Sequence, residues 1–445
     1  MMVFDGTSAL SHVSSELFQE KQQPLGLAPG FESLNPNSAS LKLFFKLINS
    51  CDCAKGKNKT HYDKRYFYNL RGFHHNPEHS MKREDMQISS VAVWVVEVPQ
   101  IAPIAPYRSH VRSSSATRSA IVRVDTTDGI TGWGEHNVNF LPDISARKMQ
   151  AQANEWLVGR DDLDIALFHR DCPFESRLKS GVELALWDIR GKAAGLSVAE
   201  LLGGVIRSRV SLAACMGIQT YERAGEIASW CVEQGFSTLK TKAGADMDED
   251  VEMVRGIRDA VGDRLKLRID PNRSYSLVEA IELCRRVEEF NLEYIEQPIT
   301  AEPLSEAVAL RRDTNVPLAL NESVVGPSSV MQILREGAAE FVLPDTHIAG
   351  GIQPCVIIGR LCEAAGIPSI MHCGHDLGPK TAAMLHVAAA CSAYSLANDS
   401  TYYGLENDIL TEPFRIEAGS IAVPTAPGLG IDVDLEMLDQ YQVDC

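Results

Sequence analysis

The feature that most constrains the fold is a strict alternation of strand-like and helix-like segments after Arg209. Amphipathic stretches such as DEDVEMVRGIRDAVG carry apolar residues at the three- and four-residue spacing of a helix. Between them, apolar runs predict eight strands at 210–216, 236–242, 265–270, 292–297, 316–321, 341–345, 368–373 and 394–398. Eight strand–helix units predict a parallel sheet closed into a barrel. A doubly wound open sheet is the alternative, but ACMGIQTYERAG after the first strand is not its usual glycine-rich phosphate loop.

The chain outside this alternation divides into three further parts. Residues 87–208 predict an α+β module, because ATRSAIVRVDTTDGITGWGEHN has the pattern of a hairpin with Asp-Gly at its turn and helical stretches follow at 144–157 and 178–202. Residues 209–409 form the expected barrel. For residues 410–445, the sequence pattern predicts a short hairpin and a helix that pack back on the first module. Residues 1–86, basic in their second half and without sustained periodicity, are expected to be a disordered extension.

Composition indicates where the protein is located in the cell and which classes of partner it does not bind. The formal net charge of −17 argues against a nucleic-acid groove or an anionic membrane surface as partner. No apolar run reaches the ~18 residues of a membrane span, and the first twenty residues lack the pattern of a signal peptide. Eleven cysteines without paired spacing fit reduced thiols. We therefore expect a cytoplasmic protein. Its expected partners, which composition does not decide, are a small-molecule carboxylate substrate and further copies of the same chain.

Polar residues recur at the carboxyl ends of the predicted barrel strands. They are separated by steps of 23 to 28 residues, each the length of one strand–helix unit. Because catalytic groups of a barrel come from the carboxyl ends of different strands, the series predicts a single site. Its members, from the second strand to the seventh, are Lys240 and Lys242, Asp270 and Asn272, Glu296, Asn321 and Glu322, Asp345, and His372.

The residue types at these strand ends indicate proton-transfer chemistry beside a cation. Lys240 and Lys242 are two apart on one strand and point the same way, so mutual repulsion is expected to lower the pKa of one ammonium and make it a base. Asp270, Glu296 and an oxygen from the fifth strand offer the hard ligands that suit Mg²⁺, with Mn²⁺ as the alternative cation.

An imidazole is expected on the other side of the site. His372 follows Asp345 by one barrel step, the arrangement of a carboxylate-oriented histidine, and His375 is the alternative imidazole. A cation with a lysine on one face and a His–Asp dyad on the other describes removal of the proton α to a metal-bound carboxylate. Each residue alone is often structural, but their order across six strand ends favours the catalytic interpretation.

These residues together resemble the enolase superfamily, in its mandelate racemase and muconate lactonising enzyme branch. The resemblance covers 87–445 and is carried by LKTKAG, RIDPN, YIEQP, PDTHIAGG and the WDIRGKAAG…LLGG helix. It implies a modified (β/α)₇β TIM barrel with an N-terminal α+β capping domain. It also implies that Lys242 is the base beside Lys240, and that Asp270 and Glu296 are metal ligands. For the third ligand, Asn321 matches the glucarate dehydratases and Glu322 matches mandelate racemase.

The resemblance divides between subgroups of the branch. Measured from Gly350-Gly351, Asp345 stands where muconate-type enzymes have a second catalytic lysine, which favours the His–Asp dyad of mandelate racemase and glucarate dehydratases. The segment EPFRIEAGSIAVPTAPGLGIDVD is also similar to glucarate dehydratases, whereas Glu-Gln-Pro at 296–298 is closer to the muconate side.

The resemblance implies a Mg²⁺-dependent lyase that dehydrates an acid sugar, an aldonate or an aldarate, to a 2-keto-3-deoxy acid. The stretch 106–118 is expected to close over the substrate, with Arg108, Arg112 and Asn272 as binding residues. A racemase or epimerase is the alternative, since it needs the same two opposed bases and no leaving group. Less favoured alternatives are a cycloisomerase, weakened by Asp345, and a barrel that has lost catalysis and serves a structural or regulatory role.

Overall fold

The computed structural model describes residues 86–139, 141, 144–161 and 164–443. The predicted disordered extension at 1–86 therefore lies, except for Met86, outside the described residues. Within the described ranges, no helix has both the length and the apolar character needed to cross a membrane.

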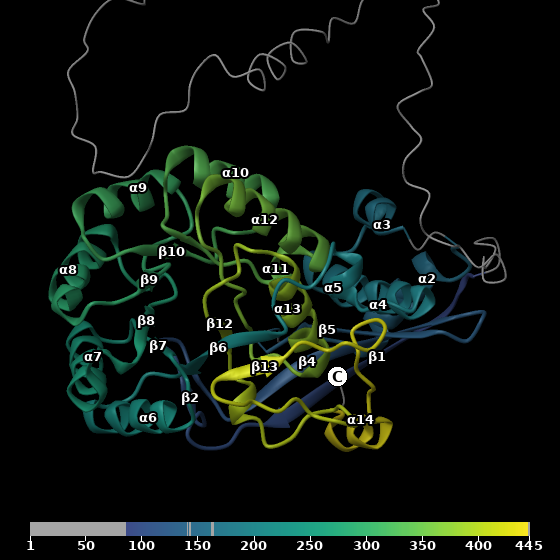
Figure 1. Cartoon of the computed structure of the whole chain (residues 1–445), viewed down its shortest axis with the longest axis horizontal. Helices are drawn as coiled ribbons and strands as arrows, with labels where there is room; N and C mark the ends of the chain where they lie inside the picture. Colours follow the sequence, from purple (N-terminus) through teal and green to yellow (C-terminus); the bar gives the residue numbers. More distant parts are fainter. Residues whose placement is uncertain (1–85, 140, 142–143, 162–163, 444–445) are drawn as a thin grey trace, which may run out of the picture. The chain divides into compact units, whose positions relative to one another are not determined.

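An antiparallel three-stranded sheet and four helices build the first module (Figure 1). Its sheet order is β1–β4–β5. The close packing of β5 on α4 depends on glycine, because a Cβ at Gly134 would collide with the carbonyl oxygen of Gly181. The elements are β1 (Ile88–Pro99), the small hairpin β2 (Tyr107–Arg108) and β3 (Ser113–Ser114), β4 (Ala116–Thr126), β5 (Thr131–Asn137), α2 (Ala146–Leu157), α3 (Ile165–Asp171), α4 (Ser176–Ala194) and α5 (Val198–Leu201).

Seven parallel strands with helices outside them form the second module (Figure 1). The strand order is β11-β10-β9-β8-β7-β6-β12. The strands are β6 (Arg209–Met216), β7 (Thr238–Lys242), β8 (Lys266–Asp270), β9 (Tyr294–Glu296), β10 (Leu318–Leu320), β11 (Phe341–Val342) and β12 (Asn398–Ser400). The helices are α6 (Tyr221–Glu233), α7 (Met247–Val261), α8 (Leu277–Val287), α9 (Leu304–Asp313), α10 (Pro327–Glu336), α11 (Thr346–Ala349), α12 (Ile352–Ala365) and α13 (Gly378–Ala390), with 3-10 turns η3 (Gly262–Arg264), η4 (Glu288–Phe290) and η5 (Tyr402–Gly404).

The sheet closes through the segment predicted as the seventh strand. Ser369 bridges Val342 of β11 in parallel, and the carbonyl of Met371 accepts a 3.0 Å hydrogen bond from the amide of Asp399 in β12. This closure confirms the expected barrel and excludes the open doubly wound sheet. The eighth strand, predicted at 394–398, is instead β12 at Asn398–Ser400, because pairing with β6 begins only at Asn398.

The last residues of the chain join both modules. The segment contains a tight antiparallel turn in which Glu417 and Ser420 exchange backbone hydrogen bonds, in keeping with the predicted hairpin. The strand β13 (Ser420–Ala422) that follows pairs antiparallel with β6, which the sequence did not predict. The helix α14 (Leu435–Tyr441) lies along β1, and the Val443 amide donates a 2.9 Å hydrogen bond to the Val95 carbonyl. The domain boundaries at 86/87, 208/209 and 409/410 stay predictions.

Candidate active site

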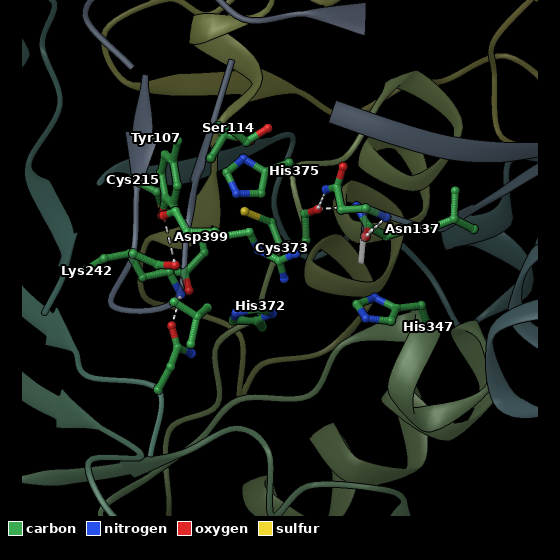
Figure 2. Close-up of a pocket in the computed structure, with 18 of the residues that line it drawn as sticks. Tyr107, Ser114, Asn137, Cys215, Lys242, His347, His372, Cys373, His375 and Asp399 are labelled. Atoms are coloured by element: carbon green, nitrogen blue, oxygen red, sulfur yellow. Dashed lines mark hydrogen bonds between the residues drawn. The ribbon is translucent and has the colours of Figure 1, made fainter. Parts of the chain in front are cut away.

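A cavity of about 350 Å³ lies at the carboxyl ends of the barrel strands (Figure 2). One wall comes from the first module and includes Tyr107, Arg112 and Asn137. The opposite wall comes from the barrel and includes Lys242 and His372. Because both modules supply its lining, the cavity is partly covered on the side where an isolated barrel would be open to water.

The two lysines of β7 both reach the cavity but have different environments. Lys240 is 3% exposed, and its Nζ lies 2.6 Å from Glu296, 2.8 Å from Asp399 and 3.3 Å from Asp270. Burial would lower the pKa of Lys240, but these three carboxylates raise it well above its usual value. The attraction of these carboxylates outweighs the expected repulsion by Lys242, so the pKa of Lys240 does not fall.

Lys242 is held in place by two neighbours across the adjoining strand. Its Nζ donates hydrogen bonds to Asp270 Oδ2 at 2.6 Å and to Asn272 Oδ1 at 2.7 Å. Asn272 follows Asp270 with a positive φ of 48°, which turns its side chain toward Lys242. The predicted substrate-binding residue Asn272 thus positions Lys242 while it lines the cavity.

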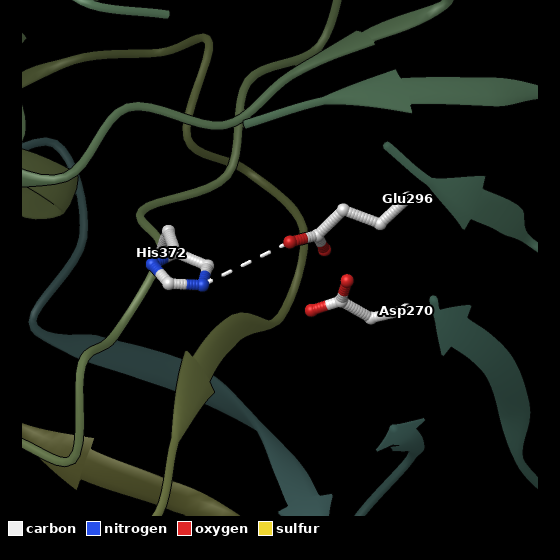
Figure 3. A group of neighbouring side chains, drawn as sticks. All are labelled: Asp270, Glu296 and His372. Carbon is white, nitrogen blue, oxygen red and sulfur yellow. Dashed lines mark ion pairs between the residues drawn. The ribbon is translucent and has the colours of Figure 1, made fainter. Parts of the chain in front are cut away.

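Asp270 and Glu296 form a buried acidic pair at the ends of β8 and β9 (Figure 3). Burial would raise the pKa of Asp270, but Lys242 and Lys240 hold it well below its usual value. Burial and the charge of Asp270 raise the pKa of Glu296 well above its usual value. Lys240 Nζ forms an ion pair with Glu296 Oε2 at 2.6 Å, but neither oxygen of this buried carboxylate accepts a hydrogen bond from the described residues. A buried carboxylate in this condition fits a cation, so the described residues suit a divalent metal.

His372 completes the group that could hold this metal. Ligand atoms of Asp270, Glu296 and His372 all lie within 4.8 Å of one another. Glu322 is not in this group: its Oε1 faces Asn272 and Arg273, while its buried Oε2 has no hydrogen-bond partner among the described residues. Asn321 lies buried at the end of β10, where its Nδ2 donates a 2.8 Å hydrogen bond to the Leu343 carbonyl. The choice between Asn321 and Glu322 as third oxygen ligand stays a prediction.

The predicted His–Asp pair is present in the described geometry. His372 Nδ1 lies 3.0 Å from Asp345 Oδ2, and its Nε2 faces Glu296 Oε1 at 3.8 Å. Burial would raise the pKa of Asp345, but His347 and Lys380 hold it well below its usual value. The alternative imidazole, His375, instead meets Gln100 at 3.0 Å and packs edge-on against Tyr107. Burial and nearby cations lower the pKa of His375 to about 3.

The stretch 106–118 contributes several cavity residues, but only one of the two arginines that were expected to bind substrate lines the cavity. Arg112 lines the cavity, in keeping with the expected binding role. Arg108 does not line it, and its Nη2 lies 3.3 Å from Glu249 on α7, with both side chains about half exposed. The expectation that Arg108 contacts substrate is not supported by this geometry, because its side chain leaves the cavity side of the hairpin for α7.

Some cavity residues were missed in the sequence. Asp399 of β12 binds Lys240 and lies 3.2 Å from Arg268, and the strand-end rule finds it once the eighth strand is extended to residue 400. Tyr107, Asn137 and Arg177 come from the first module, where no strand-end rule applies.

Comparison with known proteins agrees with this geometry. Residues 91–203 match the family model "Mandelate racemase / muconate lactonizing enzyme, N-terminal domain", and residues 222–437 match "Enolase C-terminal domain-like". The chain belongs to the mandelate racemase and muconate lactonising enzyme branch of the enolase superfamily. The predictions of this family, of the capped modified barrel and of an enzyme are confirmed.

Among the proteins that this chain resembles are sugar-acid dehydratases and a lactonizing enzyme. D-galactonate dehydratase of Xanthomonas oryzae pv. oryzae is 32% identical over 356 residues, which are 73% of this chain and 91% of the relative. Arabinonate dehydratase of Saccharolobus solfataricus is 28% identical over 334 residues, 72% of this chain and 89% of the relative. The structure of muconate lactonizing enzyme from Pseudomonas fluorescens has a TM-score of 0.74 at 26% identity, over 80% of this chain and 99% of that chain.

Proposed function

We propose that this chain is a Mg²⁺-dependent dehydratase of sugar acids. It removes the proton α to a carboxylate and expels the β-hydroxyl as water, so that the product is a 2-keto-3-deoxy acid. The observation that carries the proposal is the arrangement of two proton-transfer groups around one acidic pair. Lys242 touches Asp270, while the Asp345-bound His372 faces Glu296. The similarity to two sugar-acid dehydratases supports the choice of substrate class.

Asp270 and Glu296 would hold the cation, with Asn321 or Glu322 as a third oxygen ligand. Mg²⁺ prefers oxygen, which leaves the His372 imidazole for proton transfer, and Mn²⁺ is the alternative ion. When bound, the cation neutralises charge that develops on the substrate carboxylate as the α-proton leaves. Lys240 supplies a second, permanent positive charge between the same two acids.

The proton steps fall to Lys242 and His372. Depending on the configuration at the α-carbon, one of them takes the α-proton. Asp345 fixes the Nδ1 side of the His372 ring, so Nε2 is directed into the cavity and can give a proton to the departing hydroxyl. The C–O bond then breaks, water leaves, and the enol that remains accepts a proton to become the keto acid.

Exchange in D₂O tests the proposal directly. The protein is incubated with Mg²⁺ and a panel of aldonates and aldarates, and mass spectrometry records deuterium uptake and loss of water. We expect one sugar acid to lose water, and both signals to disappear on chelation of the metal or in Lys242→Ala and His372→Ala. Lys266→Ala, which removes an exposed lysine from the opposite end of the neighbouring strand, is the matched control and should keep full activity.

Two other outcomes contradict dehydration. Deuterium uptake without water loss would identify a racemase or epimerase, which the same pair of proton-transfer groups also permits. Absence of both signals for every acid, with Mg²⁺ bound, would reject proton abstraction from sugar acids altogether.

A further inference from the structure

We propose that Arg177 binds a second carboxylate of the substrate, so that the preferred substrates are dicarboxylic sugar acids. This inference rests on the proposed function, because it concerns the same substrate. Arg177 lies at the end of the active-site cavity that is far from Lys242. It selects aldarates over aldonates within the proposed class.

Arg177 is a cavity cation with no acidic partner among the residues that the structure describes. It lies in the first turn of α4, is half-buried and lines the cavity. Among the described residues, its guanidinium makes no ion pair and no hydrogen bond. By contrast, Lys242 is paired with Asp270 and Arg273 with Glu322. A half-buried guanidinium that lines a partly covered cavity is stabilised by an anion that binds there.

The groups around Arg177 do not cancel its charge. Burial lowers the pKa of His136 to about 3, and its neighbours His347, Arg177 and Lys380 act in the same direction. Burial also lowers the pKa of His347, so both imidazoles are neutral near pH 7. Lys380 lies 2.8 Å from Asp345 and 2.7 Å from Asp376, and these acids already balance it. Arg177 therefore gives this end of the cavity a positive charge that no described residue neutralises.

Arg177 lies toward the end of the cavity beyond His372. In Figure 2, His372 lies between Lys242 and His347, with Asn137 on the same side as His347. The helix α4 that carries Arg177 packs against α11, which carries His347 and Ile348, and all three side chains line the cavity. A substrate whose reacting carboxylate lies at Asp270 and Glu296 thus extends past His372 toward Arg177.

The chemistry of the two ends favours a carboxylate over a hydroxyl at Arg177. A guanidinium forms two parallel hydrogen bonds with a carboxylate, whereas the terminal CH₂OH of an aldonate offers one oxygen and no charge. An aldonate would leave the guanidinium desolvated and unpaired, which opposes its binding.

Calorimetric titration of the full Mg²⁺-loaded chain tests this without turnover. Aldarates and aldonates of the same stereochemistry, glucarate with gluconate and galactarate with galactonate, are compared as pairs at a temperature where turnover is negligible. We expect at least one diacid to bind ten-fold or more tightly than its monoacid. Arg177→Gln should reduce this ratio to less than about two-fold, and Arg177→Lys should leave an intermediate ratio. Arg108→Gln, an arginine outside the lining, is the matched control and should keep the wild-type ratio.

The inference and the proposed function fail in different ways. Equal affinities for diacid and monoacid, or a preference unchanged in Arg177→Gln, would overturn the role of Arg177 even if aldonates are dehydrated. A diacid preference that depends on Arg177, in a protein that neither exchanges nor dehydrates any acid, would support the inference and reject the proposed dehydration. Circular dichroism of each variant shows whether a lost preference comes from loss of folding.

Discussion

Asp345 joins the imidazole of the site to a buried charge network. One carboxylate oxygen binds His372, while the other lies 2.8 Å from Lys380 Nζ and accepts a 3.1 Å hydrogen bond from the His347 amide. Each of these contacts favours the ionised form of the carboxyl. An ionised Asp345 fixes the His372 ring and stabilises the imidazolium that forms when His372 takes a proton.

Asp345→Asn tests this role. We expect kcat for dehydration to fall by about 10²–10⁴-fold with little change in KM, because the amide holds His372 in the wrong tautomer. Asp376→Asn is the matched control, since Asp376 binds Lys380 at 2.7 Å whereas the His372 ring pairs with Asp345 and faces Glu296. Steady-state kinetics with the best sugar acid measures both variants. Equal losses in the two variants would mean that Asp345 acts through Lys380 and the fold, not through His372.

At the residue scale, the sequence predicts those site residues whose positions follow from the spacing of the barrel strands. The carboxyl ends of parallel strands meet at one face, so strand spacing alone is enough to group Lys240, Lys242, Asp270, Glu296 and His372. Side chains of the 106–118 stretch could not be ordered in this way, because spacing in an irregular segment does not fix direction. Arg108 and Arg112 therefore look alike in the sequence and separate only in the structure. The high pKa of Lys240 likewise depends on Asp399, which the predicted strand end excluded.

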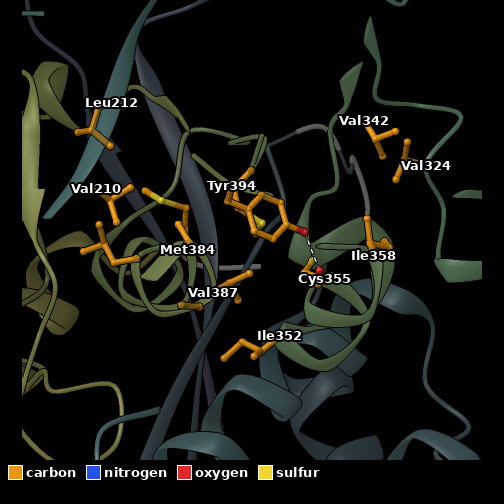
Figure 4. Packing of buried hydrophobic residues seen from close by; sticks show 14 of the residues in the cluster. Val210, Leu212, Val324, Val342, Ile352, Cys355, Ile358, Met384, Val387 and Tyr394 are labelled. Carbon is orange, nitrogen blue, oxygen red and sulfur yellow. Dashed lines mark hydrogen bonds between the residues drawn. The ribbon is translucent and has the colours of Figure 1, made fainter. Parts of the chain in front are cut away.

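At the element scale, buried side chains of α12 and α13 pack around Tyr394, next to the strands that close the barrel (Figure 4). The Tyr394 ring is fully buried, and its hydroxyl donates a 2.6 Å hydrogen bond to the Cys355 carbonyl of α12. Gly359, one turn further along α12, faces the same ring, and a Cβ there would lie 2.6 Å from Tyr394 Cε2. The sequence could predict the helix, but it could not predict that Gly359 packs against Tyr394. The two residues lie in different segments, and no spacing in the sequence relates them.

Gly359→Ala should therefore destabilise the protein. Alanine favours the helix by about 1 kcal/mol over glycine, but overpacking against this buried, hydrogen-bonded ring should cost about 2–3 kcal/mol, the upper part of the usual range, so we expect a net loss of about 1–2 kcal/mol. Urea denaturation followed by circular dichroism measures the change in the free energy of unfolding. Gly326→Ala is the control, because a Cβ there meets open space on extended backbone. Unchanged or increased stability of Gly359→Ala would show that the Tyr394 ring moves aside freely.

At the scale of the whole molecule, one buried imidazole joins three parts of the chain. His386 lies in α13 on the barrel, and its Nδ1 accepts a 3.2 Å hydrogen bond from the Ala199 amide of α5. Its Nε2 lies 3.0 Å from the Leu429 carbonyl in the C-terminal segment, so this nitrogen carries the proton. The neutral ring satisfies both partners, whereas a protonated ring would direct a second N–H at the Ala199 amide. Burial accordingly lowers the pKa of His386 from 6.5 to about 4.

This lowered pKa predicts part of the acid sensitivity of the fold. Below pH 6.5 the unfolded chain binds a proton at His386 that the folded chain excludes down to about pH 4, so stability is lost as the pH falls through this window. Between pH 7 and pH 5 the loss amounts to about 2 kcal/mol. His386→Gln removes the titration, so its free energy of unfolding should fall by about 2 kcal/mol less than that of the wild type over this range. Urea denaturation at pH 7, 6 and 5 measures the difference, and parallel pH profiles would show that His386 takes up its proton in the folded chain as readily as in the unfolded one.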